Sequence, residues 1–325
     1  MTADLDKNRE CVDALERQQN MTENLQRKSV KKIIKAAVKI AQDPATDQEK
    51  AYMAVHLVQA NIPHSKPKSD VWSRRNGNLV LGIQAGYDFK TNKSVGLPYG
   101  SIPRLILLWL ITEAVRTKSR RIELGVSLAG FMRLLGLNPE TGGGKRGDAK
   151  RLKEQLQRVF SAKFSFEWIL TDEKGRDGYK WLNMEVAPKG ELWWDDKNPE
   201  QNDIFGSWVE LGEQFYNAII ASPIPLDIRA LFALKQSPLA LDLYMLMSYE
   251  AYKAHKSGKP HFISWASLHE QMGSEYTDVK DFKKRAKAYL RKVKAVSPFL
   301  SVSDEKGGLM VAPDSLPAII PKEFH

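Results

Sequence analysis

The stretch Leu105–Ala114, LILLWLITEA, is followed later in the chain by a related stretch, Asp242–Ala251, DLYMLMSYEA. The same offset continues through the next segment, in which serine, apolar and glycine positions correspond. These are Ser127, Phe131, Leu135 and Gly136 in the first copy and Ser264, Leu268, Met272 and Gly273 in the second. A serine before an apolar periodic run and a glycine after it are typical of a capped helix. The ordered agreement indicates an internal duplication.

A second amphipathic helix follows in each copy. Its apolar residues step by three and four positions, as one buried helical face requires: Ala149, Leu152, Leu156, Val159 and Phe160, then Val279, Phe282, Ala286, Tyr289 and Leu290. Each helix precedes a strand, a turn at Asp172–Gly175 or Asp304–Gly307, and a second strand. These strands end in the same three-residue sequence, Val-Ala-Pro, at Val186–Pro188 and Val311–Pro313. The pattern predicts two winged helix-turn-helix units, each with a β-hairpin wing.

The predicted fold class is mixed α/β, predominantly helical (α+β), with two tandem winged helix-turn-helix domains. We expect a helical N-terminal extension at residues 1–60, a linker at 61–76, and domains at 77–195 and 196–325. Pro63 and Pro67 among polar residues indicate the linker. The segment Arg27–Lys39 is basic and amphipathic. It fits a helix docked on the body and a DNA-binding arm equally well.

Composition narrows the class of protein. The longest apolar run, Leu105–Ile111, is far below the roughly 18 residues that a membrane span needs, and Met1–Glu16 lacks the apolar stretch of a secretory signal. A single cysteine, Cys11, excludes an internal disulfide framework and fits a reducing compartment. We therefore expect a cytoplasmic protein. The net charge of +10 favours a polyanionic partner.

The position of the charges indicates DNA. The second copy of the amphipathic helix is nearly all positive on its polar face, whereas a solvated face usually mixes both signs. Arg and Gln of the first helix could read base edges, while a Lys-rich helix mostly contacts phosphates. Which helix reads bases stays open. The predicted DNA contacts are Lys145, Arg146, Lys150, Arg151, Gln155 and Arg158 around the first helix, Lys280, Lys284, Arg285, Lys287, Arg291 and Lys292 on the second, and Lys174, Arg176 and Lys306 on the wings.

Familiar catalytic motifs are missing. The segment Gly142–Arg146 resembles the nucleotide-binding motif G-x-x-x-x-G-K-[ST] but does not match it. Pro139 stands at the position of the first glycine, and Arg146 stands at the position of the Ser or Thr. The histidines never alternate around one apolar residue, as a metal-dependent nicking enzyme would need. Asp195 and Asp196 fit a solvated loop better than a metal site. We predict no enzymatic activity, no cofactor and no metal. For Trp181, Trp193 and Trp194 we expect packing in the core or on a wing, and not the stacking of bases.

A set of short, uncommon sequence motifs then suggests membership in a known protein family. They are Leu97–Arg104, Trp109, Thr112–Ala114, Ile122–Gly125, Phe131–Met132, Leu135–Gly136, Gly143–Lys145 and Gln155. In this order they resemble the plasmid-encoded RepA family of replication initiators, over about Gly77 to Pro188. The second half is similar, more loosely, to the two-winged-helix plan of iteron-binding initiators. Residues 1–60 carry no such resemblance.

The resemblance implies a protein that binds directly repeated double-stranded DNA sites (iterons) at a plasmid origin. It further implies opening of the adjacent A·T-rich duplex, recruitment of the host helicase or its loader and the host initiator, and autorepression. By analogy, the N-terminal winged domain would dimerise and contact backbone, in equilibrium with an active monomer, and the C-terminal one would read the iteron. The residues alone leave open a winged-helix repressor that binds an inverted repeat, a basic RNA-binding or architectural protein, and, more remotely, a nuclease or primase.

Overall fold

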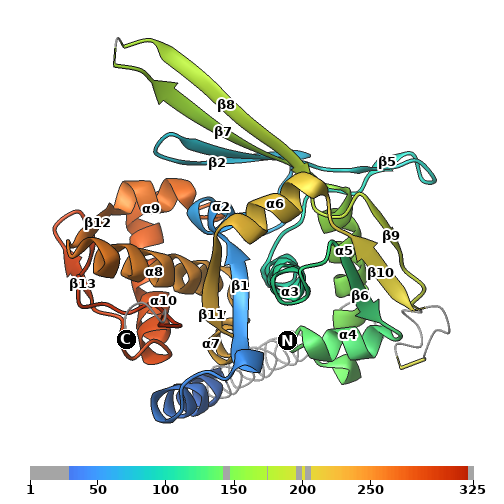
Figure 1. The fold of residues 1–325 in the computed structure, drawn as a ribbon, viewed down its shortest axis with the longest axis horizontal. Helices are drawn as coiled ribbons and strands as arrows, with labels where there is room; N and C mark the ends of the chain where they lie inside the picture. The colour runs from blue at the N-terminus through green and yellow to red at the C-terminus, as the bar shows by residue number, and fades with distance from the viewer. Residues whose placement is uncertain (1–28, 142–146, 174, 195–199, 202–205, 321–325) are drawn as a thin grey trace, which may run out of the picture.

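The structure is a computed structural model, which describes residues 29–141, 147–173, 175–194, 200–201 and 206–320. The fold is mixed α/β and mainly helical, as predicted (Figure 1). The predicted contacts Lys145, Arg146 and Lys174 lie outside the described residues, as do 28 of the residues assigned to the N-terminal extension, 1–28. No helix in the described ranges is long and apolar enough to span a bilayer.

The first half contains the elements in the predicted order. They are α3 (Ser101–Thr117), β6 (Arg121–Gly125), α4 (Leu128–Leu134), the short η2 (Pro139–Thr141), α5 (Asp148–Ser161), β7 (Lys163–Thr171) and β8 (Asp177–Glu185). Helix α3 is buried around most of its circumference, as its apolar sequence requires. The predicted cap of α4 is confirmed, because the Ser127 side chain accepts a hydrogen bond from the Gly130 N–H.

The second half repeats this order. Its elements are α8 (Pro238–Ser257), β12 (His261–Ser264), α9 (Trp265–Gln271), α10 (Val279–Ala295), β13 (Val302–Glu305) and β14 (Gly308–Val311). The strands form one antiparallel sheet in the order β12-β14-β13. Ser264, whose side chain caps α9, lies opposite Gly308 in this sheet. The predicted hairpin is therefore present, with β14 between the strand that precedes the helices and the strand that follows them.

The hairpin of the first half joins a different sheet. Strand β7 pairs with β3 (Leu79–Gln84) as well as β8, and β3 pairs with β2 (Val71–Asn76), which gives the order β2-β3-β7-β8. Strand β6 pairs instead with β10 (Ser207–Glu210), beside β9 (Lys189–Glu191). In Figure 1 the long β7–β8 hairpin projects from the top of the molecule. The short β4 (Tyr87–Asp88) and β5 (Lys93–Ser94) form a further hairpin.

Residues 50–76 differ from the sequence prediction. The expected helical extension ends in η1 (Asp47–Glu49), strand β1 (Lys50–Ala54) and α2 (Val55–Gln59), and the expected linker contains β2. Strand β1 pairs with β11 (Pro223–Asp227), between α6 (Glu213–Ala221) and α7 (Ile228–Leu234). The partner strand lies far away in the sequence, so local periodicity could not reveal this ladder. Residues 29–42 are helical, as expected.

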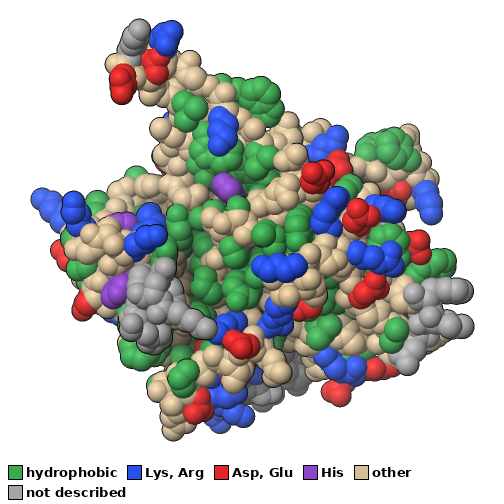
Figure 2. All heavy atoms as spheres, viewed as in Figure 1, with side chains coloured by type: hydrophobic (Ala, Val, Ile, Leu, Met, Phe, Trp, Pro, Cys, Tyr) green, Lys and Arg blue, Asp and Glu red, His purple; other side chains and the backbone are tan. Residues whose placement is uncertain are grey.

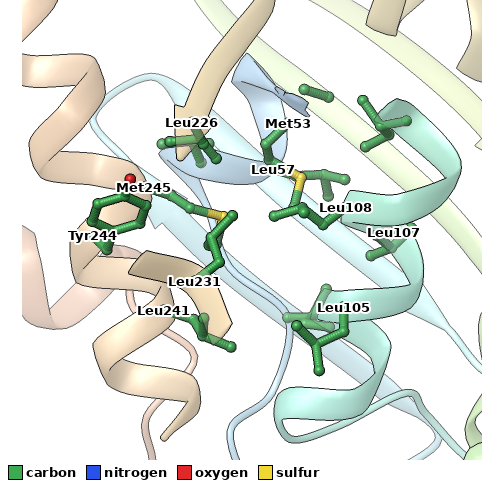
Figure 3. Close-up of a cluster of buried hydrophobic side chains, with 14 of the residues drawn as sticks. Met53, Leu57, Leu105, Leu107, Leu108, Leu226, Leu231, Leu241, Tyr244 and Met245 are labelled. Carbon is green, nitrogen blue, oxygen red and sulfur yellow. The ribbon is translucent and has the colours of Figure 1, made fainter. Parts of the chain in front are cut away.

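One continuous hydrophobic core joins the two halves. Figure 3 shows Leu105 and Leu108 of α3 facing Leu241 and Met245 of α8, with side chains from β1, α2, β11 and α7 around them. Tyr244 is fully buried, and its hydroxyl accepts a hydrogen bond from the Asp227 N–H at 3.0 Å and donates to the Asp227 carbonyl at 3.4 Å. The two copies of the repeat are thus packed against each other through their first helices.

Candidate nucleic-acid interface

Helix α10 presents the largest set of exposed cations among the elements predicted to contact DNA. The Asp278 carboxylate caps its start by accepting a hydrogen bond from the Lys280 N–H. Phe282, Ala286, Leu290 and Val293 are buried and hold one face against the body, as the apolar spacing predicts. Five cations are exposed: Lys280, Lys284, Arg285 and Arg291, together with Lys294, whose Nζ donates to the Val302 carbonyl at 3.1 Å. Among the described residues, Lys284, Arg285 and Arg291 have no ion-pair partner.

The other cations of α10 are held by neighbouring side chains. The ammonium groups of Lys283 and Lys287 lie 5.3 Å and 5.8 Å from the centre of the Trp265 ring. Lys287 also forms an ion pair with Asp304 of β13, which ties the helix to the hairpin. Lys292 lies 5.1 Å from the Tyr289 ring. Lys306 is exposed at the tip of the β13–β14 turn.

Helix α5 presents fewer cations at its surface. Lys150 and Arg151 are exposed, as predicted, but the Arg151 Nη1 lies 3.4 Å from the carboxylate of Asp148. Lys153 and Glu154 are also exposed on this helix. The mixture of signs resembles an ordinary solvated helix face more than the face of α10 does.

Two residues predicted to contact DNA form hydrogen bonds with the protein's own backbone. Gln155 is 5% exposed, and its Oε1 accepts a hydrogen bond from the Tyr99 N–H at 3.1 Å. Arg158 donates from Nη1 to the Leu97 carbonyl at 3.1 Å, and its guanidinium lies 5.2 Å from the Tyr99 ring. The Gln155 assignment is corrected because the side chain is buried, whereas Arg158 is half-buried and its contact with DNA stays a prediction. Gln155 stands three residues after Leu152 and four before Val159, so its position on the apolar face contained the signal that its residue type obscured.

The β7–β8 hairpin combines one predicted cation with an unexpected aromatic pair. Arg176 is exposed near the turn and forms an ion pair with Asp172, Nε to Oδ2 at 2.7 Å. Tyr179 and Trp181 are 58% and 60% exposed, and their rings stack with centroids 5.5 Å apart. Figure 2 shows hydrophobic side chains along this projecting hairpin. Trp181 thus packs on its neighbour within the wing while staying exposed, whereas Trp194 is buried beside Phe131.

A buried ionic cluster lies between the halves, and the sequence reasoning missed it. Arg104 of α3 and Asp242 of α8 are 3% and 1% exposed, and they form a two-pronged ion pair with distances of 2.6 Å and 2.7 Å. His64 Nε2 lies 2.7 Å from the same carboxylate. The available signal was a charged residue inside or beside each of two long apolar runs.

The electrostatics of this cluster follow from burial and from the arginine. Burial lowers the pKa of His64, although its hydrogen bond to Asp242 acts in the opposite direction. Burial alone would raise the pKa of Asp242, but the Arg104 charge and the hydrogen bonds from His64 and Arg104 hold it below its usual range. The stable arrangement is a neutral His64 that donates to an ionised Asp242, whose charge Arg104 balances.

Comparison with known proteins assigns the chain to a family. Residues 97–267 match the family described as plasmid encoded RepA protein, which is more than half of the 325 residues. The chain belongs to this family. The resemblance predicted from the sequence motifs is confirmed, and membership in the RepA family identifies the protein as a plasmid replication initiator.

The first motif that carries the resemblance to the RepA family lies at the start of α3. The motif Leu97–Arg104 surrounds the start of α3, where Gly100 adopts a left-handed φ of +83° that a side chain would strain. Backbone groups of Leu97, Tyr99 and Gly100 bind Arg158, Gln155 and Arg104 respectively. The motif Leu97–Arg104 therefore connects α3 and α5 through backbone hydrogen bonds. The match ends at Ser267 in α9, so α10 lies outside it.

Two solved structures are similar to the RepA-family chain. One is a crystal structure of selenomethionine derivatives of domains 2 and 3 of RctB, 12% identical, with a TM-score of 0.46, covering 79% of this chain and 95% of that one. The other, of RctB domains 2–3, is 10% identical, with a TM-score of 0.41 and the same coverages. No curated protein matches the chain significantly.

Proposed function

We propose that this protein initiates plasmid replication by binding directly repeated double-stranded DNA sites at the origin. In this proposal it promotes opening of the adjacent A·T-rich duplex and recruits the host helicase or its loader and the host initiator, and it represses its own gene. The observation that carries the proposal is the family match over residues 97–267. The exposed cations of α10 supply the DNA-binding surface that such a function needs.

We infer that each half is a winged helix-turn-helix. Both halves follow the order helix, strand, helix, helix, strand, strand, and the β12-β14-β13 sheet supports the assignment in the second half. The first half departs from the pattern, because β6 pairs with β10 and the hairpin pairs with β3. The longer sheet that results carries the hairpin further from the body than β13–β14.

The DNA contacts of the proposal follow the exposed cations. Lys280, Lys284, Arg285 and Arg291 of α10 enter a major groove, with Lys306 against a flanking phosphate. Lys150 and Arg151 of α5 and Arg176 of the first hairpin make a weaker, second set of contacts. Two such helices about one turn of DNA apart would cover on the order of 20 base pairs. The protein acts by binding, with no bond-making chemistry of its own.

Self-association in the N-terminal half is part of the proposal. The exposed, stacked Tyr179 and Trp181 lie on β8, an edge strand of its sheet. Exposed apolar groups on an unpaired edge favour pairing with another chain. We expect Trp181→Lys to shift a dimer toward monomer in sedimentation analysis, whereas Phe262→Lys, at a half-exposed site of β12, should leave the distribution unchanged. Equal distributions for both variants and the wild type would contradict this interface.

The experiment that tests the function is a footprint of the purified protein on the DNA that flanks its own gene. It is done at physiological salt with competitor DNA, so that non-specific phosphate binding is suppressed. We expect protection of directly repeated sites in helical phase, beside an A·T-rich tract. Protection of one inverted repeat over a promoter would favour a repressor. The absence of discrete protection would contradict sequence-specific duplex binding and favour RNA or architectural binding.

A further inference from the structure

The turn between α9 and α10 is held by residues that precede the repeat. The Asn61 N–H donates to the Gln271 carbonyl at 3.0 Å, and the His64 N–H donates to the Gly273 carbonyl at 2.7 Å. A Cβ at Gly273 would stand 1.8 Å from the Ile62 oxygen, so only glycine permits this approach. The segment Asn61–His64, expected to be part of a linker, is therefore packed directly against the turn that starts the basic helix.

Arg74 of β2 holds the same turn from another side. Its Nε donates to the Met272 carbonyl and its Nη2 to the Ser274 carbonyl, both at 2.8 Å. The guanidinium lies 3.6 Å from the centre of the Trp72 ring, which fixes its plane. Because β2 belongs to the β2-β3-β7-β8 sheet, these bonds join the sheet of the first half to the turn of the second.

The buried Arg104–Asp242 ion pair contacts the segment Asn61–His64 from the other side. Besides Asp242, the Arg104 guanidinium donates to the carbonyls of Ile62, Pro63 and Gly100, at 2.7 Å, 3.1 Å and 2.7 Å. The segment Asn61–His64 thus lies between the first helix of one half and the helix-turn-helix of the other. A small rotation of α8 against α3 would break several buried, charge-assisted hydrogen bonds at once, and such bonds are costly to leave unmade.

We propose that Arg104, Asp242 and Arg74 are positioning residues that fix the α9–α10 turn on the N-terminal half, and with it the spacing at which the two basic helices meet DNA. We name these three residues and the segment Asn61–His64 the inter-half clamp. The inference rests on the proposed DNA-binding function. It identifies the ligand as duplex DNA with two contact regions at one fixed separation, because half-site spacing follows from the geometry of the protein.

The test uses the full-length chain with three variants. The double substitution Arg104→Met with Asp242→Leu removes the ion pair without leaving a buried orphan charge. Arg74→Met removes only the bonds to the turn. Arg75→Met is the matched control, because Arg75 is the next residue of β2 and donates to the Gly77 carbonyl instead of the turn. Circular dichroism and thermal unfolding first establish that each variant is folded.

The DNA probe is a duplex that the wild-type protein selects from a random-sequence pool, together with derivatives that carry about 5 or about 10 extra base pairs between the two protected regions, half or one helical turn. We expect the half-turn insertion to weaken wild-type and Arg75→Met binding by about tenfold or more, comparable to losing one good base-pair contact or more. The clamp variants should bind all spacings within about threefold of each other. Folded clamp variants with the wild-type spacing preference would overturn the proposal.

A second measurement separates the clamp from the proposed function. Amide hydrogen exchange of the free protein reports protection of residues 61–64 and 272–274 without any DNA. We expect exchange there to be about tenfold faster or more in both clamp variants than in Arg75→Met, as the loss of a buried charge-assisted hydrogen bond implies. Unchanged protection would overturn the clamp. If the wild-type protein selects no duplex, the proposed function fails while the exchange result still decides the clamp.

Discussion

Helices α5 and α10 occupy the same position in the two halves of the molecule, yet their polar side chains are used differently. In α5, Gln155 and Arg158 bind backbone groups of the Leu97–Gly100 segment, which folds over the helix. In α10, Lys284 and Arg291 remain exposed. A duplicated pattern therefore fixes the order of elements and the buried face of each helix, whereas the surroundings of each copy decide which polar residues can reach a ligand.

The two halves also differ in how their first helices contribute to the interface between them. Helix α3 supplies the cation, Arg104, and α8 supplies the anion, Asp242. In the alignment of the repeats Arg104 corresponds to Leu241 and Asp242 to Leu105, so neither charge is present in the other copy. The asymmetry makes the halves complementary partners, so that removal of one charge affects both.

The largest expected effect comes from breaking this complementarity. Asp242→Ala leaves Arg104 buried without its carboxylate, and we expect it to lower the free energy of unfolding by about 3–5 kcal/mol. Arg104→Met in the same chain should restore most of this loss, because no uncompensated charge then remains. Urea denaturation of the two variants and the wild type measures both effects. A loss below about 1 kcal/mol for Asp242→Ala, the range of an exposed pair, would contradict the buried position of the pair.

A smaller effect sharpens the contrast between α5 and α10. Gln155→Leu removes the acceptor of the Tyr99 N–H, and we expect the free energy of unfolding to fall by about 1–3 kcal/mol without a change in DNA affinity. Gln157→Leu, at an exposed position of the same helix, serves as the control and should change stability little. Denaturation and DNA titration of both variants provide the data. A specific loss of DNA affinity for Gln155→Leu, with normal stability, would return this residue to the DNA-binding surface.

The smallest effect concerns the pH dependence of the contact between the halves. His64 faces Asp242, Arg104 and Arg74, and its pKa in the folded protein is below the ordinary value of 6.5. The unfolded chain therefore binds this proton first as the pH falls, and the stabilisation present above pH 6.5 is lost progressively below it.

Stability should fall in this range by up to about 1.4 kcal/mol per pH unit from this group. His64→Gln retains an N–H donor and does not titrate, so it should show a shallower pH dependence in thermal or urea unfolding. Parallel pH profiles for the wild type and the variant would contradict a role for His64.

The sequence predicted what local periodicity and capping determine. The apolar faces of α5 and α10, the Ser127 and Ser264 caps and both hairpins follow from spacing and side-chain chemistry within short segments. The pairing of β1 with β11 and of β7 with β3 could not be predicted, because each partner lies far along the chain. The Arg104–Asp242 pair likewise arises only when α3 and α8 meet.

The candidate site was predicted only in part, because the surroundings of each side chain depend on segments that lie far away in the sequence. Residue type identified the cations of α10, of which Lys280, Lys284, Arg285 and Arg291 are exposed. It misplaced Gln155, because the segment before α3 covers this side chain and supplies its hydrogen-bond partner, the Tyr99 N–H. It did not predict that Tyr179 and Trp181 are exposed on a projecting hairpin, because the sheet that contains this hairpin also needs β2 and β3.

The salt dependence of DNA affinity shows whether α10 makes the main phosphate contacts and α5 the lesser ones. The double variants Lys284→Gln/Arg291→Gln and Lys150→Gln/Arg151→Gln each remove two exposed positive charges, so they are matched in charge and chemistry. We expect the slope of log affinity against log salt to decrease in magnitude by about 2 for the α10 variant and by less than about 0.5 for the α5 variant. An equal decrease for both, or a larger one for α5, would contradict the assignment of the main contacts to α10.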